Sequence, residues 1–382
     1  MNPNPMSLRD MLYGPAGSVY LYSLLIVIIL MTMMVSFRLL LSRRKIGYLS
    51  MIIALGLLVI QHIQMIVLAY SGELSPGEEY TSLLLKVLAF VTVNAGIYQL
   101  YNATKQRDFI LYGCTAAVTV LVSLTYWSAH RWLAGSPQLQ PLMRPLGMEL
   151  FLFVLIFLCF MLVHPRIGQN GKYQTMLTVY FASHAIHMAN VYLFGGKQGE
   201  LRLLELAVPF FFYIVLFLFI VERVIEILQA IYTSSITDGL TKLYNRKYFE
   251  TRVSQHIKSG APVSLIFSDI DNFKQLNDTK GHHMGDKVLK QVARILAEET
   301  EEIGICSRYG GEELVILVND LDTDALELAE RIRMRVEKET AVTLSIGCKR
   351  WRKRMTAGTL IKGADKAMYE AKTTGKNKVV QG

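Results

Sequence analysis

Cysteine is scarce in this chain of 382 residues, which has four cysteines and no Cys-x-x-Cys spacing. Cys114 and Cys159 lie in long apolar runs, whereas Cys306 and Cys348 lie in separate predicted strands. Zinc sites and disulfide scaffolds rely on closely spaced or paired cysteines, so the sequence indicates neither.

Charged residues are also few, at 19% of the chain against 52% hydrophobic residues. The composition changes near Glu222, with long apolar runs before it and an ordinary soluble mixture after it. Much of the net charge of +9 lies in short clusters beside apolar runs, such as Arg43-Arg44-Lys45. Membrane orientation explains such clusters, so we expect no nucleic-acid partner.

Seven stretches of the first half approach the roughly 20 apolar residues that cross a bilayer. We therefore predict an all-α transmembrane bundle of seven spans over residues 1–221. The first span has no basic region before it and is too long for a cleaved signal peptide, so we expect it to be retained. The predicted spans are Gly17–Leu41, Gly47–Tyr70, Thr81–Tyr101, Phe109–Trp127, Met148–Val163, Thr175–Phe194 and Leu201–Val221.

The loops between these spans predict the orientation, because cytoplasmic loops carry an excess of Lys and Arg. The second loop has three acidic residues and no basic one, while the odd-numbered loops are basic. We therefore expect the N-terminus outside and the C-terminal half in the cytoplasm of a bacterium, with the chain in the inner membrane. The basic residues of the odd-numbered loops are Arg38, Arg43, Arg44, Lys45, Lys105, Arg107, Arg166 and Lys172; the acidic residues of the second loop are Glu73, Glu78 and Glu79; Arg131, Arg144, Lys197 and Arg202 fall on the outer side.

Polar residues within the predicted spans are candidates for a sensory role, because ionisable groups are costly in a membrane. They are His62, Asn94, His184, His187 and Glu205. His184 and His187 share a helix face, which would suit a metal or a haem. Interhelical hydrogen bonding is the interpretation that we favour. The sequence does not name the stimulus.

Residues 222–235 form a predicted helical connector. Val221, Val224, Leu228 and Ile231 are spaced three, four and three apart, as in the seam of a two-stranded coiled coil. We expect a homodimer through this connector and through the C-terminal domains. The alternative is a helix that packs on its own bundle.

The second half alternates predicted helices and strands. This order favours an α+β fold for residues 236–382, with helices over an antiparallel-type sheet. Between two apolar runs, Gly310-Gly311 predicts a tight turn with positive φ, and strand alternation places Glu312 and Glu313 on opposite faces. The expected helices are Tyr248–Lys258, Asp286–Glu299, Asp324–Glu337 and Thr359–Thr373; the expected strands are Val263–Phe267, Ile303–Ser307, Leu314–Val318 and Val342–Cys348.

Carboxylates at the end of the first strand and in the hairpin predict a metal-phosphate site. Asp269 and Glu312 would hold Mg²⁺, which takes one or two carboxylates and completes its shell with phosphate oxygens and water. Lys274 would bind phosphate oxygens, together with the backbone N–H groups around Asn272 and Phe273. Asn277 and Asp286 match the hydrogen-bonding edge of guanine.

Several ordered motifs in the last 145 residues resemble the GGDEF family of diguanylate cyclases. The resemblance implies a palm-like fold and the conversion of two GTP molecules to cyclic di-GMP and two pyrophosphates, with one GTP held by each of two facing domains. The motifs are Asp238-Gly239-Leu240-Thr241, Asp269-Ile270-Asp271-x-Phe273-Lys274-x-x-Asn277-Asp278, Gly281-His282-x-x-Gly285-Asp286, Arg308-Tyr309-Gly310-Gly311-Glu312-Glu313, Leu344-Ser345-Ile346-Gly347 and Ala371-Lys372-x-x-Gly375-Lys376-Asn377.

The resemblance also implies roles for individual residues. Metal ions, Mg²⁺ or Mn²⁺, would be held by Asp269, the Ile270 carbonyl and Glu312, while Glu313 would assist the attacking hydroxyl or contact a metal. The residues implied in substrate binding are Lys274, Lys372 and Lys376 for phosphates, Asn277 and Asp286 for guanine, and Asn272, Phe273, Gly310 and Gly311 beside the nucleotide.

Four positions bear on departures from the family's usual pattern. Leu314 and Lys376 replace the usual phenylalanine and arginine and keep their character. Many members carry an Arg-x-x-Asp product-inhibition site before the hairpin, where this chain has Glu301 and Gly304. We therefore predict no feedback inhibition through that site, and Arg331 alone would be surface charge.

Three alternatives stay open at this point. The domain could be a catalytically weak module that binds nucleotide or product. It could make a mixed GMP–AMP dinucleotide, against which Asp286 argues. The membrane half could be a metal- or haem-binding protein with the cyclase as its readout.

Overall fold

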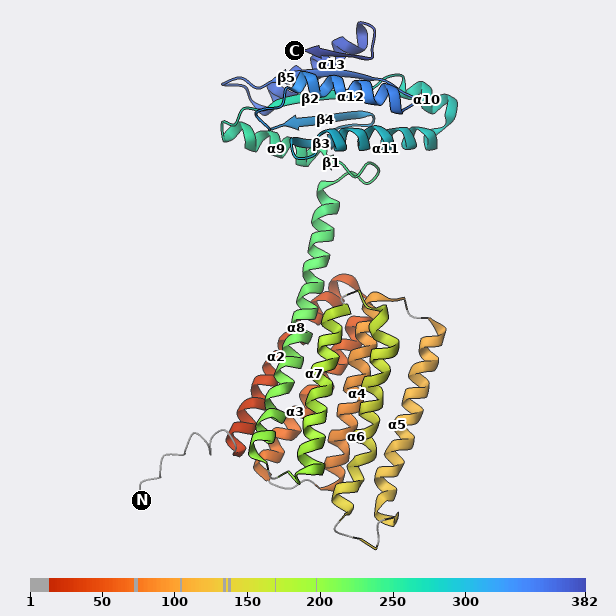
Figure 1. The fold of residues 1–382 in the computed structure, drawn as a ribbon, viewed down its shortest axis with the longest axis vertical. Helices are drawn as coiled ribbons and strands as arrows, with labels where there is room; N and C mark the ends of the chain where they lie inside the picture. The colour runs from red at the N-terminus through yellow and green to blue at the C-terminus, as the bar shows by residue number, and fades with distance from the viewer. Residues whose placement is uncertain are drawn as a thin grey trace, which may run out of the picture. The chain divides into compact units, whose positions relative to one another are not determined.

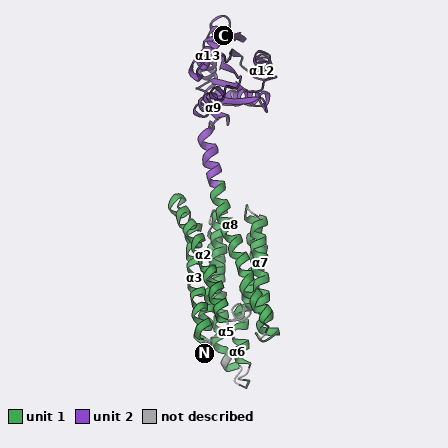
Figure 2. Ribbon diagram, turned by 90° about the vertical axis from the view of Figure 1, so that its left-hand side faces the viewer, with its two compact units in different colours: residues 1–226 green, residues 227–382 purple. Residues whose placement is uncertain are grey.

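The computed structural model describes residues 14–71, 75–103, 105–132, 135–136, 139–168, 170–196 and 198–382. Glu73 and Lys197, which were used above for the orientation, lie outside the described residues. The chain divides into two compact units, Met1–Glu226 and Ile227–Gly382 (Figure 2). Each unit is described by itself below.

Unit 1 is helical throughout its secondary structure (Figure 1). The helix α6 continues into a π-helical turn, Cys159–Val163, and a 3₁₀ turn, His164–Arg166, and α7 continues into a second π-helical segment, η3 (Ala189–Leu193). The α-helices are α2 (Pro15–Arg43), α3 (Ile46–Ser71), α4 (Pro76–Tyr101), α5 (Gln106–Trp132), α6 (Gln140–Leu158), α7 (Asn170–Met188) and α8 (Gly199–Ile236).

Six helices of the described residues are long and apolar enough to cross a membrane. The predicted count of seven is therefore approximate, because the sixth predicted span, Thr175–Phe194, falls in α7 and η3 and is not among the six. Its polar residues, including His184, His187 and Asn190, lower its hydropathy. Large apolar side chains such as Val27 and Phe157 are exposed on the bundle, as expected for surfaces that face lipid.

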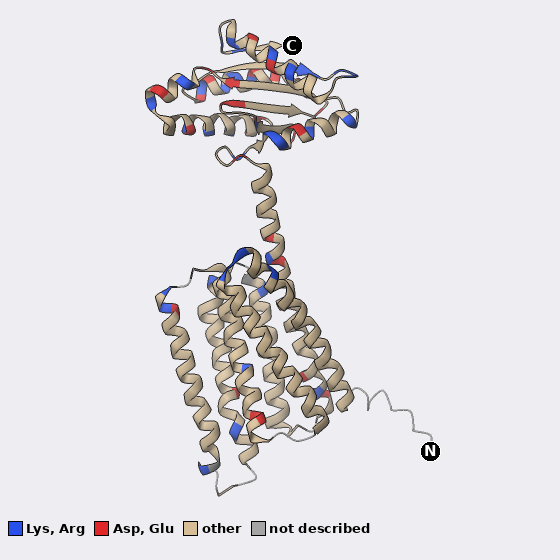
Figure 3. Cartoon of the chain, turned by 180° about the vertical axis from the view of Figure 1, so that it is seen from behind, with Lys and Arg blue, Asp and Glu red and all other residues tan. Residues whose placement is uncertain are grey.

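The charges of unit 1 are unevenly distributed. Figure 3 shows bundle helices that carry few charges, with Lys and Arg gathered at the end from which α8 leaves the bundle. At this end Lys172 forms an ion pair with Glu222, and the Arg223 guanidinium lies 4.9 Å from the centre of the Tyr101 ring. Such a basic end is typical of the cytoplasmic side of a membrane domain.

Helices α3 and α4 approach closely at two glycines. A Cβ atom at Gly47 would lie 2.8 Å from the carbonyl oxygen of Gly96, and one at Gly96 would lie 3.0 Å from that of Gly47. Small residues at such crossings allow the backbones of membrane helices to pack.

Unit 2 contains a six-stranded mixed sheet in the order β1-β3-β4-β2-β5-β6. The pairs β3–β4, β4–β2 and β2–β5 are antiparallel, as predicted, whereas β1–β3 and β5–β6 at the edges are parallel. The strands are β1 (Tyr244–Asn245), β2 (Ser264–Ile270), β3 (Gly304–Arg308), β4 (Glu313–Val318), β5 (Leu344–Arg350) and β6 (Lys378–Gln381); the helices are α9 (Arg246–Lys258), α10 (Phe273–Lys280), α11 (His282–Glu299), α12 (Ala325–Glu339) and α13 (Ala357–Thr373).

Two apolar clusters cover the two faces of this sheet. Alternation along β2 sends Ile266 and Ile270 into the cluster with α11 and α12, and sends Leu265 and Phe267 into the cluster with α9 and α13. Since α10 follows β2 after two residues, the polar end of β2 lies at the start of a helix that the sequence did not predict.

Candidate active site

The end of β2 carries the first predicted metal ligand. The strand runs to Ile270, three residues beyond its predicted end at Phe267, so Asp269 is a strand residue with register partners Glu313 on β4 and Ser345 on β5. Asp269 is 6% exposed. The antiparallel register thus brings Asp269 beside Glu313 at the same end of the sheet.

Lys372 from α13 reaches this pair of strands. Its Nζ donates to Asp269 Oδ1 at 2.7 Å. Burial lowers the pKa of Lys372, but the hydrogen bond and charge of Asp269 and the nearby Glu312 outweigh it and raise the pKa. Lys372 therefore stays protonated among these carboxylates.

The two acids of the site are short of positive charge even with Lys372 present. Burial raises the pKa of Asp269, and Lys372 opposes this only in part. Burial also raises the pKa of Glu313, and the carboxylates of Asp269, Asp365 and Glu312 add to the rise. A further cation would relieve this repulsion, so the residues present fit a divalent metal.

The hairpin differs from its prediction in two respects. Neither Gly310 nor Gly311 has a positive φ, and Glu312 precedes β4 rather than lying in it, so strand alternation does not set the directions of Glu312 and Glu313. Instead, glycine leaves space, because a Cβ at Gly310 would lie 2.3 Å from a carboxylate oxygen of Glu313. A Cβ at Gly311 would meet no atom within 4 Å.

Arg308 holds the turn in place, a role that the sequence did not predict. Its Nε donates to the carbonyl oxygens of Gly310 and Gly311, both at 3.1 Å, and Nη2 donates to that of Gly311 at 2.7 Å. Its Nη1 lies 3.2 Å from both carboxylate oxygens of Asp238, 70 residues away in sequence. Asp238 and Arg308 each belong to a motif quoted above, but neither was assigned a role there.

Asp271 is a second residue whose role the sequence missed. It is 3% exposed and accepts three hydrogen bonds, from Thr343 Oγ1 at 2.7 Å, Ser345 Oγ at 2.6 Å and the backbone N–H of Asn377 at 3.0 Å. Three donors occupy its oxygens, so Asp271 anchors β5 and the loop before β6 rather than facing a ligand.

The predicted phosphate groups lie around the start of α10. Asn272 precedes the helix with φ of 55°, and its Oδ1 accepts from Lys376 Nζ at 2.6 Å. Lys376 itself has φ of 60°. Lys274 and Asn272 are exposed, and Phe273 is half-buried against the core. The structure therefore brings Lys376 to the start of α10 and joins Lys372 to Asp269.

The two predicted guanine-binding residues come from adjacent helices. Asn277 lies in α10, and Gly285 and Asp286 are the fourth and fifth residues of α11. A Cβ at Gly285 would lie 1.9 Å from Asn277 Oδ1, so the missing side chain of Gly285 makes room for the Asn277 carboxamide. Asp286 is exposed one residue further on.

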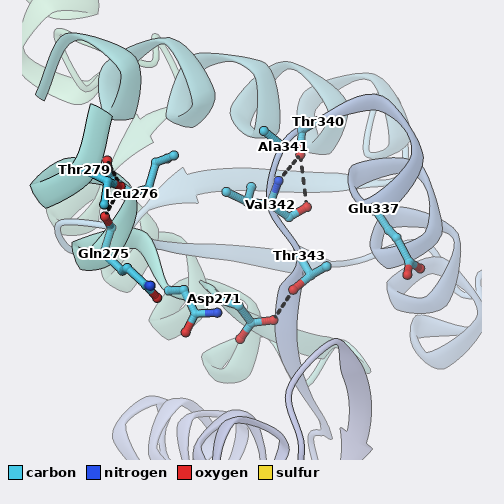
Figure 4. Close-up of a pocket in the computed structure, with 10 residues that line it drawn as sticks. Asp271, Gln275, Leu276, Thr279, Glu337, Thr340, Ala341, Val342 and Thr343 are labelled. Atoms are coloured by element: carbon cyan, nitrogen blue, oxygen red, sulfur yellow. Dashed lines mark hydrogen bonds between the residues drawn. The ribbon is translucent and has the colours of Figure 1, made fainter. Parts of the chain in front are cut away.

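A cavity of about 520 Å³ lies beside this site. Figure 4 shows Asp271 hydrogen-bonded to Thr343 at its margin, with Gln275 and Thr279 of α10 and Glu337 of α12 around it. The cavity does not include Asp269, Asn277, Asp286 or Glu312. It shares Asn272 with the predicted nucleotide site but contains none of the predicted metal-binding or guanine-binding side chains.

The described residues contain no group of three or more His, Cys, Asp or Glu side chains arranged to hold a metal. A Mg²⁺ site in unit 2 would need only one or two carboxylates, because substrate phosphates supply the other ligands. In unit 1, His184 and His187 instead contact carboxylates and a backbone carbonyl from other helices, which agrees with the favoured interpretation of interhelical bonding.

The family match to known proteins lies in the C-terminal part of the chain. The family model "Diguanylate cyclase, GGDEF domain" matches residues 235–378. Over 167 residues the chain is 41% identical to the response regulator PleD of Caulobacter vibrioides, covering 38% of this chain and 36% of PleD. Over 157 residues it is 40% identical to the probable diguanylate cyclase DgcT of Escherichia coli, covering 37% of this chain and 35% of DgcT.

The chain thus spans about a third of the length of the curated relatives that it matches. Among solved structures, it is similar to the coiled coil and GGDEF domain of DgcB from Caulobacter crescentus in complex with c-di-GMP. The identity is 29% and the TM-score 0.40, with 42% of this chain and 93% of that chain covered.

Proposed function

Since residues 235–378 form a GGDEF domain, we propose that this chain is a membrane-bound diguanylate cyclase. It converts two GTP molecules to cyclic di-GMP and two pyrophosphates under the control of its membrane unit. In each half-reaction, the 3′-hydroxyl oxygen of one GTP forms a bond to the α-phosphorus of the other, and the bond to pyrophosphate breaks.

The observation that carries this proposal is the charge arrangement around Asp269. Its carboxylate and that of Glu313 are adjacent and partly buried, with Lys372 hydrogen-bonded to Asp269. Burial raises the pKa of both acids, and neighbouring carboxylates add to the rise at Glu313, so a divalent metal ion held here would stabilise their ionised forms and keep coordination positions open for phosphate oxygens. A purely structural strand end would have no need of this arrangement.

The side chains divide into three roles. Asn277 and Asp286 bind guanine, Lys274, Lys372 and Lys376 bind phosphate oxygens, and Asp269, Glu312 and the Ile270 carbonyl hold the metal. Glu313 accepts the proton of the attacking hydroxyl in this proposal, which its register position opposite Asp269 and its raised pKa support. Bound Mg²⁺ or Mn²⁺ supplies polarisation of the phosphoryl group.

Catalysis requires two domains that face each other, and the connector supports a homodimer. Leu228, Ile231 and Tyr232 of α8 are each more than half exposed. An exposed apolar stripe on one helix is typical of a surface that pairs with a second copy. The basic end of unit 1 supports a cytoplasmic position for the GGDEF domain and an outside N-terminus.

Product inhibition through the Arg-x-x-Asp position is absent in this proposal. Glu301 is exposed and acidic, and a Cβ at Gly304 would lie 2.6 Å from the carbonyl oxygen of Leu317, so β3 has no room there for an aspartate. We predict that micromolar cyclic di-GMP does not inhibit the purified enzyme noncompetitively. Such inhibition would contradict the assignment.

The proposed activity is tested with the full chain in lipid nanodiscs, GTP and Mg²⁺, and chromatographic detection of cyclic di-GMP. We expect product from the wild type, none from Glu312→Ala, and wild-type amounts from Glu327→Ala, which changes an exposed acid on α12. Absence of product from a demonstrably dimeric wild type would refute the proposal.

A further inference from the structure

Unit 1 encloses a cavity of about 280 Å³ among its helices. Side chains from α2, α3, α4, α6, α7 and α8 line it, which makes it the meeting point of most of the bundle. Seven of the lining residues carry a carboxylate, an ammonium or an imidazole group, namely His62, Glu79, Lys86, Glu149, His184, His187 and Glu205. The sequence had singled out only the histidines and Glu205 among them as intramembrane groups.

Glu149 is the centre of this cluster. It is 3% exposed, and its Oε1 lies 3.2 Å from His187 Nε2. Its Oε2 has no hydrogen-bond partner, although Lys86 Nζ lies 3.5 Å away and His184 Nδ1 lies 3.3 Å away. A buried carboxylate oxygen without a hydrogen bond is costly, which favours a donor arriving from the cavity.

The contacts of the two histidines indicate which of their ring nitrogens carry a hydrogen atom. His184 Nε2 lies 2.9 Å from the backbone oxygen of Glu149 and so carries the hydrogen, which leaves Nδ1 to accept from Lys86 at 3.4 Å. His187 lies between carboxylates, with Nδ1 2.5 Å from Glu205 Oε1 and Nε2 3.2 Å from Glu149 Oε1. Both of its nitrogens lie at hydrogen-bond distance from carboxylate oxygens, an arrangement that suits an imidazolium.

The cavity is then left with an unbalanced negative charge. Its lining holds three carboxylates, Glu79, Glu149 and Glu205, against two cations, Lys86 and His187, so one negative charge remains. Glu79 Oε2 accepts from Tyr126 OH at 2.7 Å, which does not neutralise it. Uncompensated charge within a bundle is costly, so a single positive charge completes the site.

The rest of the lining is suited to an apolar body bearing that charge. Tyr22, Tyr180, Tyr192, Phe212 and Tyr213 contribute aromatic rings, and the electron-rich faces of such rings attract organic cations. The buried hydroxyl of Tyr192 also has no hydrogen-bond partner. An inorganic cation would use only the carboxylates and leave these rings without a role.

We propose that this cavity binds a small organic cation, a protonated amine on an aromatic or aliphatic body, as the signal of the membrane unit. The amine faces Glu79 and Glu149, and the body packs among the tyrosine rings. The binding of the cation is inferred from the cavity alone, whereas the role of the cation as a signal rests on the proposed cyclase function.

Two irregular backbone segments line the cavity, one in η3 and one in α8. The π-helical segment η3 contributes Tyr192 to the lining, and π segments often occur at functional sites. Pro209 also lines the cavity within α8 and has no N–H to donate to the carbonyl of Glu205, which weakens the helix there. Because α8 continues to Ile236, a bend at Pro209 changes the direction in which the connector helix leaves the cavity.

The test compares three probes that share a phenyl ring and differ in charge: 2-phenylethylamine, L-phenylalanine and 3-phenylpropionate. Binding to the full chain in nanodiscs is measured by isothermal titration calorimetry, with empty nanodiscs as the blank. We expect the amine to bind at least about tenfold more tightly than the zwitterion or the anion. Equal binding of the three, tighter binding of the anion, or no binding of the amine at millimolar concentration would overturn the proposal.

Two matched variants locate the site. Glu79→Gln removes a carboxylate that lines the cavity, and we expect it to weaken amine binding about tenfold. The control is Glu78→Gln, at the adjacent residue, which caps α4 and does not line the cavity. Thermal unfolding of both variants checks the fold. Unchanged amine affinity in a folded Glu79→Gln variant would overturn the placement.

Cyclic di-GMP synthesis is measured in the same samples. Amine binding without cyclase activity would refute the proposed enzyme and leave the cavity assignment standing. Cyclase activity without amine binding would refute the cavity assignment and leave the proposed enzyme activity standing.

Discussion

Asp269 and Asp271 are two residues apart in one motif, yet their surroundings predict opposite effects of the same substitution. Asp271 accepts three hydrogen bonds within the fold, whereas Asp269 accepts one, from Lys372. We therefore predict that Asp271→Asn mainly lowers stability and that Asp269→Asn mainly abolishes activity.

The magnitude for Asp271→Asn follows from its three donors. The backbone N–H of Asn377 cannot turn away, so the asparagine oxygen must face Asn377 and Thr343, and its amide must face Ser345, whose hydroxyl can rotate to accept. All three hydrogen bonds then persist without a charged acceptor, and each loses about 1 kcal/mol. The expected loss in the free energy of unfolding is about 3 kcal/mol, a fall in Tm of roughly 6–12 °C for a unit of this size.

The expected cost of Asp269→Asn is smaller. Burial raises the pKa of Asp269, which shows that its ionised form is disfavoured in the fold. Neutralising the side chain therefore relieves a penalty while it weakens the bond from Lys372, and we expect a net change of at most about 1 kcal/mol. Cyclase activity of the full chain should nevertheless disappear, because the substitution removes a proposed metal ligand.

The assay is thermal unfolding of residues 227–382 by circular dichroism at neutral pH, without metal or nucleotide. Activity of both variants is measured in parallel on the full chain. An unchanged Tm for Asp271→Asn, or a larger fall for Asp269→Asn than for Asp271→Asn, would refute the division of roles between the two carboxylates.

Three further predictions concern the turn and the pH dependence. Gly310→Ala should reduce activity at least about tenfold, because its Cβ would displace the Glu313 carboxylate, while Gly311→Ala should leave the Tm within about 2 °C, because its Cβ meets no atom. Arg308→Gln should lower kcat with little change in Tm, because it frees the Gly310 and Gly311 carbonyls, and Arg308→Lys should restore activity only in part. The apparent affinity for Mn²⁺, followed by its electron paramagnetic resonance signal, should fall as the pH is lowered into the raised titration range of Asp269 and Glu313, because protons compete with the metal.

Each of these predictions has a contradicting outcome. Full activity of Gly310→Ala would mean that the turn relaxes freely, and full activity of Arg308→Gln would mean that Arg308 does not position it. For the metal, affinity that stays constant until the ordinary carboxylate range would exclude raised pKa values at the site. The stability of the metal-free domain should change with pH in the opposite direction to the metal affinity. Between the ordinary and the raised pKa values of these two acids, the folded state binds more protons than the unfolded state, so the free energy of unfolding rises as the pH falls.

The sequence by itself determined the features that depend on local pattern. The change in composition near Glu222 separates the helical unit from the α/β unit, and each of the seven apolar runs predicts a helix, although the more polar sixth is not among the six candidate membrane spans. A carboxylate after an apolar run, followed by Gly-Gly-Glu-Glu further on, located the two halves of the candidate site. These signals survive in the sequence because each depends on neighbouring residues.

Only the tertiary structure decided which of these groups face one another. Asp269 and Asp271 look alike in the sequence, but strand register places Asp269 beside Glu313, whereas Asp271, just beyond the end of β2, accepts hydrogen bonds from Thr343 and Ser345. Arg308 meets Asp238 across 70 residues of chain. Glu149 is a single acid in an apolar run, and its significance comes from partners on two other helices. Hydrogen bonds and charge pairs of this kind depend on distance in space, which no local pattern of residues encodes.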